Sequence, residues 1–164
     1  MLICCVIALL FCITGNAKVP YIPKIINYSV SDYKAGNQNW AVSQGPGGKM
    51  YIGNNRGLLV FDGIHWDLVK LPNNLGVRAL YISKDGRIYV GSFEEFGYFE
   101  MDDENDLIYH SLSSSEMNVY LNNDEFWTIN EYKGEIYFQS FRSFFIYDGE
   151  KVRKGVSDLS PLYI

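Results

Sequence analysis

The chain has 164 residues, of which 48% are hydrophobic, 16% are aromatic and 20% are charged. This composition excludes an intrinsically disordered chain, because it supplies enough apolar side chains to build a core. The formal net charge is −5 and the isoelectric point is near 5.0, so the charge balance gives no indication that this segment binds nucleic acid. Tyrosine, phenylalanine and glycine are plentiful (13, 10 and 15 residues), which favours β-strands joined by tight turns over helices.

The N-terminal segment differs from the rest of the chain. Residues 1–16 carry no charged side chain, residues 2–13 are almost wholly apolar, and Gly15 and Ala17 place small side chains where a signal peptidase cleaves. A membrane-spanning helix needs about 20 apolar residues, which is more than this run supplies. We interpret residues 1–17 as a secretory signal peptide and expect the protein to be exported.

All of the cysteines lie inside this segment, at Cys4, Cys5 and Cys12. The mature chain would therefore have no thiol, which excludes a disulfide framework, a cysteine nucleophile and a cysteine-based metal site. A lipid-modified Cys12 is an alternative, but Phe11 stands where such signals usually have a small residue. We expect no cofactor and no metal in this part of the protein.

A short sequence pattern occurs three times. Its copies read KMYIGN from Lys49, RIYVGS from Arg87 and EIYFQS from Glu135, and a glycine lies three residues before the tyrosine of each copy. The second interval is longer than the first because it contains a polar, serine-rich insertion. A repeat of about 40 to 45 residues with four strands in each unit is typical of a propeller blade.

Each unit divides into short apolar runs separated by turn residues such as glycine, asparagine and aspartate. We expect strands at residues 40–43, 49–54, 58–62 and 66–71 in the first unit, 77–83, 87–92, 96–100 and 106–112 in the second, and 126–130, 135–140 and 144–148 in the third. A closing strand of the third unit is not clear from the sequence.

The second strand of each unit is apolar at almost every position, as expected of a sheet that is covered on both faces. A single blade cannot bury such a sheet, so blades must stack, and a closed propeller needs about four to eight of them. The predicted fold class is therefore all-β, a partial β-propeller of about three four-stranded antiparallel blades. We place the blades at about residues 39–72, 77–112 and 126–164, after a lead-in segment at residues 18–38, and expect them to open a longer chain.

Two stretches carry a family resemblance, QNWAVSQGPGGKMYIGNNRGLLVFDGIHW from Gln38 and VRALYISKDGRIYVGSFEEFGYF from Val77. They resemble the regulator-propeller repeats of Bacteroidetes sensor proteins, over about residues 20–149. The resemblance implies the N-terminal part of an extracytoplasmic sensor on the periplasmic side of the inner membrane. A membrane helix and a signalling or DNA-binding part would follow, as in a transmembrane transcriptional regulator. Gln139 departs from the pattern, because the first two copies have glycine there.

In a blade of this kind, the turn between strands two and three and the link to the next blade emerge on one rim. This rim collects amides, arginines and aromatic residues, which suit sugar hydroxyls and uronate or sulfate groups. The candidate ligand-binding residues are Asn54, Asn55, Arg56, Arg78, Glu94 and Arg142. A structural role stays open, because asparagine and glycine are also favoured at tight turns. Trp40 and Trp127 are expected near the axis as core or channel-lining residues.

We find no catalytic motif in the sequence and predict no catalytic or metal-binding residue. His65 and His110 have no partner at a spacing typical of a metal site or a catalytic triad. The acidic run at residues 102–106 lacks the glycine and the glutamate of a calcium-binding loop.

Three functions stay open at this level. The first is a sensing propeller that recognises an oligosaccharide or a glycan-binding partner and signals through a downstream membrane helix. For this sensor, a homodimer of the full-length protein stays open. The second is a secreted propeller enzyme that acts on polysaccharide, and the third is a protein-docking scaffold. The sensor predicts a membrane helix and a cytoplasmic domain downstream, whereas the enzyme predicts further blades with converging carboxylates.

Overall fold

Twelve strands in three sheets form the computed structural model, which describes residues 23–156. Blade 1 contains β1 (Asn39–Gln44), β2 (Met50–Asn54), β3 (Gly57–Phe61) and β4 (Trp66–Val69); blade 2 contains β5 (Ala79–Ile82), β6 (Ile88–Gly91), β7 (Phe96–Met101) and β8 (Leu107–Ser111); blade 3 contains β9 (Phe126–Tyr132), β10 (Glu135–Ser140), β11 (Phe144–Tyr147) and β12 (Val152–Lys154). The predicted signal peptide and its cysteines lie outside the described residues.

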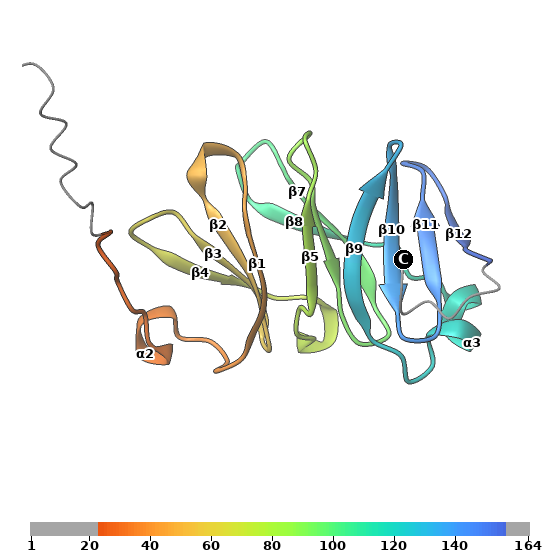
Figure 1. The fold of residues 1–164 in the computed structure, drawn as a ribbon, viewed down its shortest axis with the longest axis horizontal. Helices are drawn as coiled ribbons and strands as arrows, with labels where there is room; N and C mark the ends of the chain where they lie inside the picture. The colour runs from red at the N-terminus through yellow and green to blue at the C-terminus, as the bar shows by residue number, and fades with distance from the viewer. Residues whose placement is uncertain (1–22, 157–164) are drawn as a thin grey trace, which may run out of the picture.

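The three sheets stand next to one another as blades, from blade 1 at the left to blade 3 at the right (Figure 1). Each is four-stranded, with its strands hydrogen-bonded antiparallel in chain order. The first strands β1, β5 and β9 lie side by side, so they form the inner edge of the array. The described blades form an open array and not a closed ring, which confirms the predicted all-β partial propeller of about three four-stranded blades.

The third blade has a closing strand that the sequence analysis did not recognise. Strand β12 pairs antiparallel with β11, with Val152 opposite Tyr147 and Lys154 opposite Phe145. Of its three residues only Val152 is partly buried. A strand this short, with one half-buried apolar residue, lacks the alternating pattern by which strands are recognised.

Aromatic side chains fill the interface between blades 2 and 3. Phe96, Phe126, Phe138 and Phe145 are at most 1% exposed, and they belong to one buried cluster. The interface between blades 1 and 2 is more aliphatic and includes Leu58, Val60, Val77 and Val90 beside Tyr51. Neighbouring blades therefore bury their apolar strands against each other, as the repeat predicts.

Glycine at the end of the second strand lets the next blade approach closely. A β-carbon on Gly53 would lie 2.9 Å from the side chain of Val77, and one on Gly91 would lie 2.7 Å from the β-carbon of Phe126. Beside these contacts, the N–H of Val77 donates to the carbonyl of Asn54 (2.9 Å), and the N–H of Phe126 donates to the carbonyl of Ser92 (3.0 Å). The junctions from blade 1 to 2 and from blade 2 to 3 therefore share one geometry.

The lead-in segment covers the face of blade 1 that points away from blade 2. Its helix α2 (Val30–Tyr33) ends with Tyr33, which is buried against Ile52 and Leu59. Tyr28 packs edge-on against Trp66, with ring centroids 5.2 Å apart. The sequence analysis separated this segment from the propeller but did not predict that it packs on the first sheet.

The remaining helical turns lie in the connections. These are η1 (Pro46–Gly48), η2 (Pro72–Asn74), η3 (Ser115–Met117) and α3 (Asn118–Leu121). The last two lie in the insertion between blades 2 and 3, where Leu121 joins the aromatic cluster. Among residues 23–156, no helix is both long enough and apolar enough to cross a membrane.

Candidate ligand site at the inner edge of the blades

Three residues at equivalent positions of the blades meet at the inner edge. The three residues are Trp40, Arg78 and Trp127. Each directly precedes a residue of the first strand that pairs with the same position of the second strand, where the three blades have Gly53, Gly91 and Gln139. The guanidinium carbon of Arg78 lies 4.5 Å from the ring centroid of Trp40. The ring centroids of Trp40 and Trp127 are 5.6 Å apart, in an edge-to-face arrangement.

We call this group the axial cluster. It consists of Trp40, Arg78 and Trp127 with their neighbours Gln38, Asn55, Glu125 and Phe141. These residues come from all three blades, so only the stacking of the blades brings them together.

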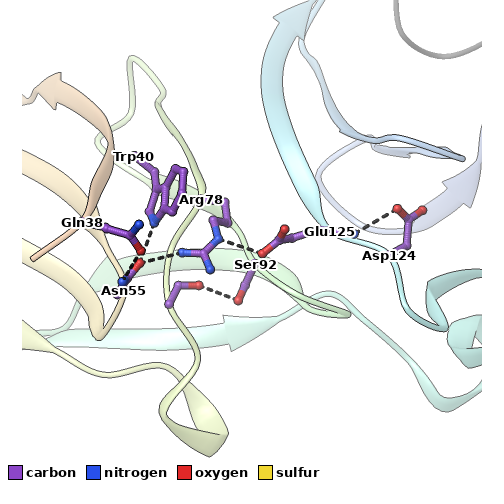
Figure 2. Close-up of polar contacts among 8 residues, drawn as sticks. Gln38, Trp40, Asn55, Arg78, Ser92, Asp124 and Glu125 are labelled. Carbon is purple, nitrogen blue, oxygen red and sulfur yellow. Dashed lines mark hydrogen bonds and ion pairs between the residues drawn. The ribbon is translucent and has the colours of Figure 1, made fainter. Parts of the chain in front are cut away.

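The amide of Asn55 connects the first two blades. Its Oδ1 accepts hydrogen bonds from Nε1 of Trp40 (2.7 Å) and from Nη1 of Arg78 (3.0 Å). Its Nδ2 donates to Oε1 of Gln38 (2.7 Å), as Figure 2 shows. The turn between β2 and β3 thus holds the indole and the guanidinium in a fixed orientation.

An ion pair connects the second blade to the third. Nε of Arg78 lies 2.7 Å from Oε1 of Glu125, and both side chains are 23% exposed. A half-buried, charge-assisted hydrogen bond of this length is stronger than an exposed ion pair. Because the two charges compensate each other, the centre of the axial cluster carries no net charge.

Three further hydrogen bonds made by side chains fix the backbone beside this cluster. The hydroxyl of Ser92 donates to the carbonyl of Gly76 (2.6 Å), as Figure 2 also shows. The hydroxyl of Ser140 donates to the buried carboxylate of Asp124, which in turn accepts the N–H of Glu125 (3.0 Å). These contacts position the backbone that carries Arg78 and Glu125.

Asn54 does not take part in this cluster, although it was a candidate ligand-binding residue. Its side chain is fully buried and holds the lead-in segment. Oδ1 accepts the N–H of Gly36 (2.9 Å), while Nδ2 donates to the carbonyls of Gly36 (2.7 Å) and Gln38 (3.1 Å). The structure therefore gives Asn54 a structural role.

The candidates Arg56, Glu94 and Arg142 share one position in the turns between strands two and three, and all three are exposed. Glu94 has a left-handed backbone (φ 55°), and its carboxylate accepts the N–H of Asn123. No side-chain hydrogen bond or ion pair links any of the three to the axial cluster within the described part of the chain. Of the six candidates, the structure brings together Asn55 and Arg78.

Sequence reasoning missed part of the cluster. Glu125 was not singled out, because its contact with Arg78 depends on two blades being stacked. Trp40 and Trp127 were expected near the axis, and their equal position in the first and third copies could have predicted their contact. Trp40 is 41% exposed, and Phe141, which packs against Trp127 with centroids 5.6 Å apart, is 55% exposed.

The histidines lie away from this cluster, in surface pairs. Nδ1 of His65 lies 3.2 Å from the carboxylate of Asp62, and Nε2 of His110 lies 3.0 Å from that of Glu100. Backbone N–H groups of His65 and Ile64 bind the Asp62 carboxylate and lower its pKa to about 2. Across residues 23–156 there is no group of three or more histidine, cysteine or acidic side chains placed to hold a metal.

Comparison with known proteins gives a match at the level of structure. No family model matches the sequence, and no curated protein matches it. Among solved structures, the fold is similar to the extracellular domain of BT4673, described as a one component system of B. thetaiotaomicron. The TM-score is 0.65 at 12% identity, over 82% of this chain and 19% of that one.

The extracellular domain of BT3049, described as a hybrid two component system of the same organism, has a TM-score of 0.55 at 20% identity. The match covers 81% of this chain and 18% of that one. Virginiamycin B lyase from Staphylococcus aureus, as a catalytically inactive variant with quinupristin, has a TM-score of 0.61 at 16% identity, over 85% of this chain and 47% of that one. The chain thus spans less than a fifth of the length of the two sensor domains.

These similarities define the class of structure. The chain is a partial β-propeller. Within that class, its fold matches a fragment of the regulator-type propellers in the extracellular domains of B. thetaiotaomicron sensor systems, as the resemblance implied. At such identities the match concerns the fold alone.

Proposed function

We propose that this chain is the extracytoplasmic, ligand-sensing part of a signal-transduction protein that regulates transcription, and that its axial cluster contacts a glycan. The similarity to extracellular domains of sensor systems and the predicted signal peptide support an exported sensor. The observation that carries the ligand proposal is the axial cluster, where exposed aromatic rings lie next to amides that hydrogen bonds to Trp40 and Arg78 hold in place.

The chemistry of the cluster suits a sugar. A sugar ring has an apolar face of C–H groups and an edge of hydroxyls, so it stacks on an aromatic ring while its hydroxyls exchange hydrogen bonds with amides. Trp40 and Phe141 offer the exposed rings, and Gln38 and Asn55 offer the amides. Because Glu125 compensates Arg78, acidic sugars would instead meet the exposed cations Arg56 and Arg142 at the same rim.

A ligand that touches all three blades can also produce a signal. Trp40 belongs to blade 1, Arg78 to blade 2 and Phe141 follows β10 of blade 3, so one bound molecule would stabilise one relative arrangement of these blades. Signalling requires that the ligand binds one arrangement of the full-length protein more tightly than another. A membrane anchor and a homodimer of the full-length protein belong to this proposal.

Replacing Trp40 by alanine is expected to weaken oligosaccharide binding about tenfold or more, because the change removes a stacking surface worth about 0.5–1.5 kcal/mol together with its buried area. The measurement is isothermal titration calorimetry of the complete extracytoplasmic part against a panel of neutral and acidic oligosaccharides. Tyr132→Ala is the control, because Tyr132 is 59% exposed on blade 3 and outside the cluster.

Two outcomes would contradict the proposal. The absence of heat with every oligosaccharide would exclude glycan binding and favour a protein-docking role. Equal binding by the Trp40 and Tyr132 variants would place the glycan somewhere other than the axial cluster.

A secreted propeller enzyme is the second candidate, because virginiamycin B lyase shares this fold. In the axial cluster the one carboxylate, Glu125, is paired with Arg78, and within residues 23–156 both histidines lie in surface pairs. Polysaccharide cleavage commonly needs two carboxylates across the scissile bond. An enzyme would therefore need catalytic carboxylates from other blades. Formation of cleavage products from the same panel of oligosaccharides would favour the enzyme.

A further inference from the structure

A cleft opens between blades 1 and 2 on the rim opposite the axial cluster. Its volume is about 620 Å³, which lies in the range of small-molecule sites. Its lining includes Lys49, Tyr51, Asp85, Ile88, Met101 and Leu107. The sequence analysis did not predict this cleft, because it forms only where two blades face each other. Both blades are complete four-stranded sheets, so its walls do not depend on any further blade.

The tyrosine of the first repeat reaches this cleft because a glycine makes room for it. A β-carbon on Gly45 would lie 2.6 Å from the ring of Tyr51. The Tyr51 side chain is 3% exposed, and burial raises the pKa of its hydroxyl. That hydroxyl makes no hydrogen bond to another residue in the part of the chain that the structure describes. The hydroxyl oxygen is not fully enclosed, so the group can donate a hydrogen bond to an acceptor that enters the cleft.

The cleft is lined by two cations, Lys49 and Arg87, and by two carboxylates, Asp85 and Glu100. Arg87 is paired with Glu100 (3.2 Å), and the carboxylate of Asp85 accepts the hydroxyl of Ser83, which lowers the pKa of Asp85. Lys49 forms no ion pair within the described residues. Opposite Lys49 and Tyr51, the wall of blade 2 has an apolar part, formed by Ile88, Met101 and Leu107, beside its charged residues.

We propose that this cleft binds a small carboxylate with an apolar or aromatic body. The carboxylate accepts hydrogen bonds from the ammonium of Lys49 and from the hydroxyl of Tyr51, and the apolar body lies on the wall of blade 2. A charge-assisted hydrogen bond in a partly desolvated site is stronger than one between neutral groups. This site is separate from the axial cluster, so its existence does not rest on glycan sensing.

The test uses phenylacetate as the probe and its neutral analogue phenylacetamide as the comparison. Binding is followed by NMR chemical-shift titration of the mature protein. Phenylacetate is expected to give saturable shifts at Lys49, Tyr51 and Ile88, and phenylacetamide is expected to bind about tenfold more weakly, because it loses the charge-assisted bond. Lys49→Gln is expected to weaken phenylacetate binding by a similar factor, whereas Lys84→Gln, a control on a neighbouring turn, leaves it unchanged.

The comparison of the two probes on the unchanged protein keeps the test valid if a variant folds poorly. Non-saturable shifts with phenylacetate would overturn the proposal. Equal binding of the two probes would also overturn it, and so would an equal loss of affinity in the Lys49 and Lys84 variants, because attraction to any surface lysine would then explain the result.

Discussion

Replacing Phe96 by alanine is expected to lower the free energy of unfolding by about 3–5 kcal/mol. Phe96 is fully buried, and its ring centroid lies 4.7 Å from those of Phe126 and Phe138 and 5.3 Å from that of Phe145. These partners all belong to blade 3. Truncation would therefore open a cavity in the middle of a blade interface, which rigid sheets cannot close.

Urea denaturation followed by tryptophan fluorescence measures this loss. Phe93→Ala is the matched control, because Phe93 lies three residues earlier in the chain and is 40% exposed. A surface substitution of this kind should change the free energy of unfolding by no more than about 0.5 kcal/mol. If both variants lose the same small amount, blades 2 and 3 do not pack through Phe96.

Replacing Gly91 by valine is expected to destabilise the protein by about 1–3 kcal/mol or more through overpacking. A β-carbon at this position would lie 2.7 Å from the β-carbon of Phe126 and 3.3 Å from its carbonyl oxygen, so the backbone of the next blade would have to move. Valine favours strands over glycine, so strand propensity alone would predict the opposite sign. The sign of the change thus separates blade packing from strand propensity.

Gln139→Val is the control for this substitution. Gln139 occupies the same register in blade 3 and is only partly covered, and no described blade follows it. We expect its stability in urea to change by less than about 1 kcal/mol. A Gly91 variant as stable as the unchanged protein would show that blades 2 and 3 do not approach as closely as the structure has them.

The repeat made most of the fold predictable. Tyr51, Tyr89 and Tyr137 occupy the same position in the second strand of the three sheets, and each sheet needs similar turns and covered faces. Strand β12 was missed because its residues Val152–Lys154 are too few and too polar to show alternation. The packing of the lead-in segment was missed because it depends on Tyr33 meeting the surface of β2 and β3, which only the folded sheet creates.

The candidate site was predictable in part, for a related reason. The turn chemistry identified Asn55 and Arg78, but it could not separate Asn55 from Asn54, whose side chain alternates to the other face and binds the lead-in segment. Glu125 comes from a polar connection and gains its role only when blade 3 places it 2.7 Å from Arg78. Local patterns predict which residues lie at the rim, whereas contacts between blades decide which of them act together.

Both proposed sites depend on blades that stack with their first strands side by side at the inner edge. The most direct measurement is the nuclear Overhauser effect between the indole protons of Trp40 and Trp127, which are far apart in sequence but have ring centroids 5.6 Å apart. We predict clear cross-peaks between the two rings. Assigned indole signals without any cross-peak between them would contradict the stacking of the three blades.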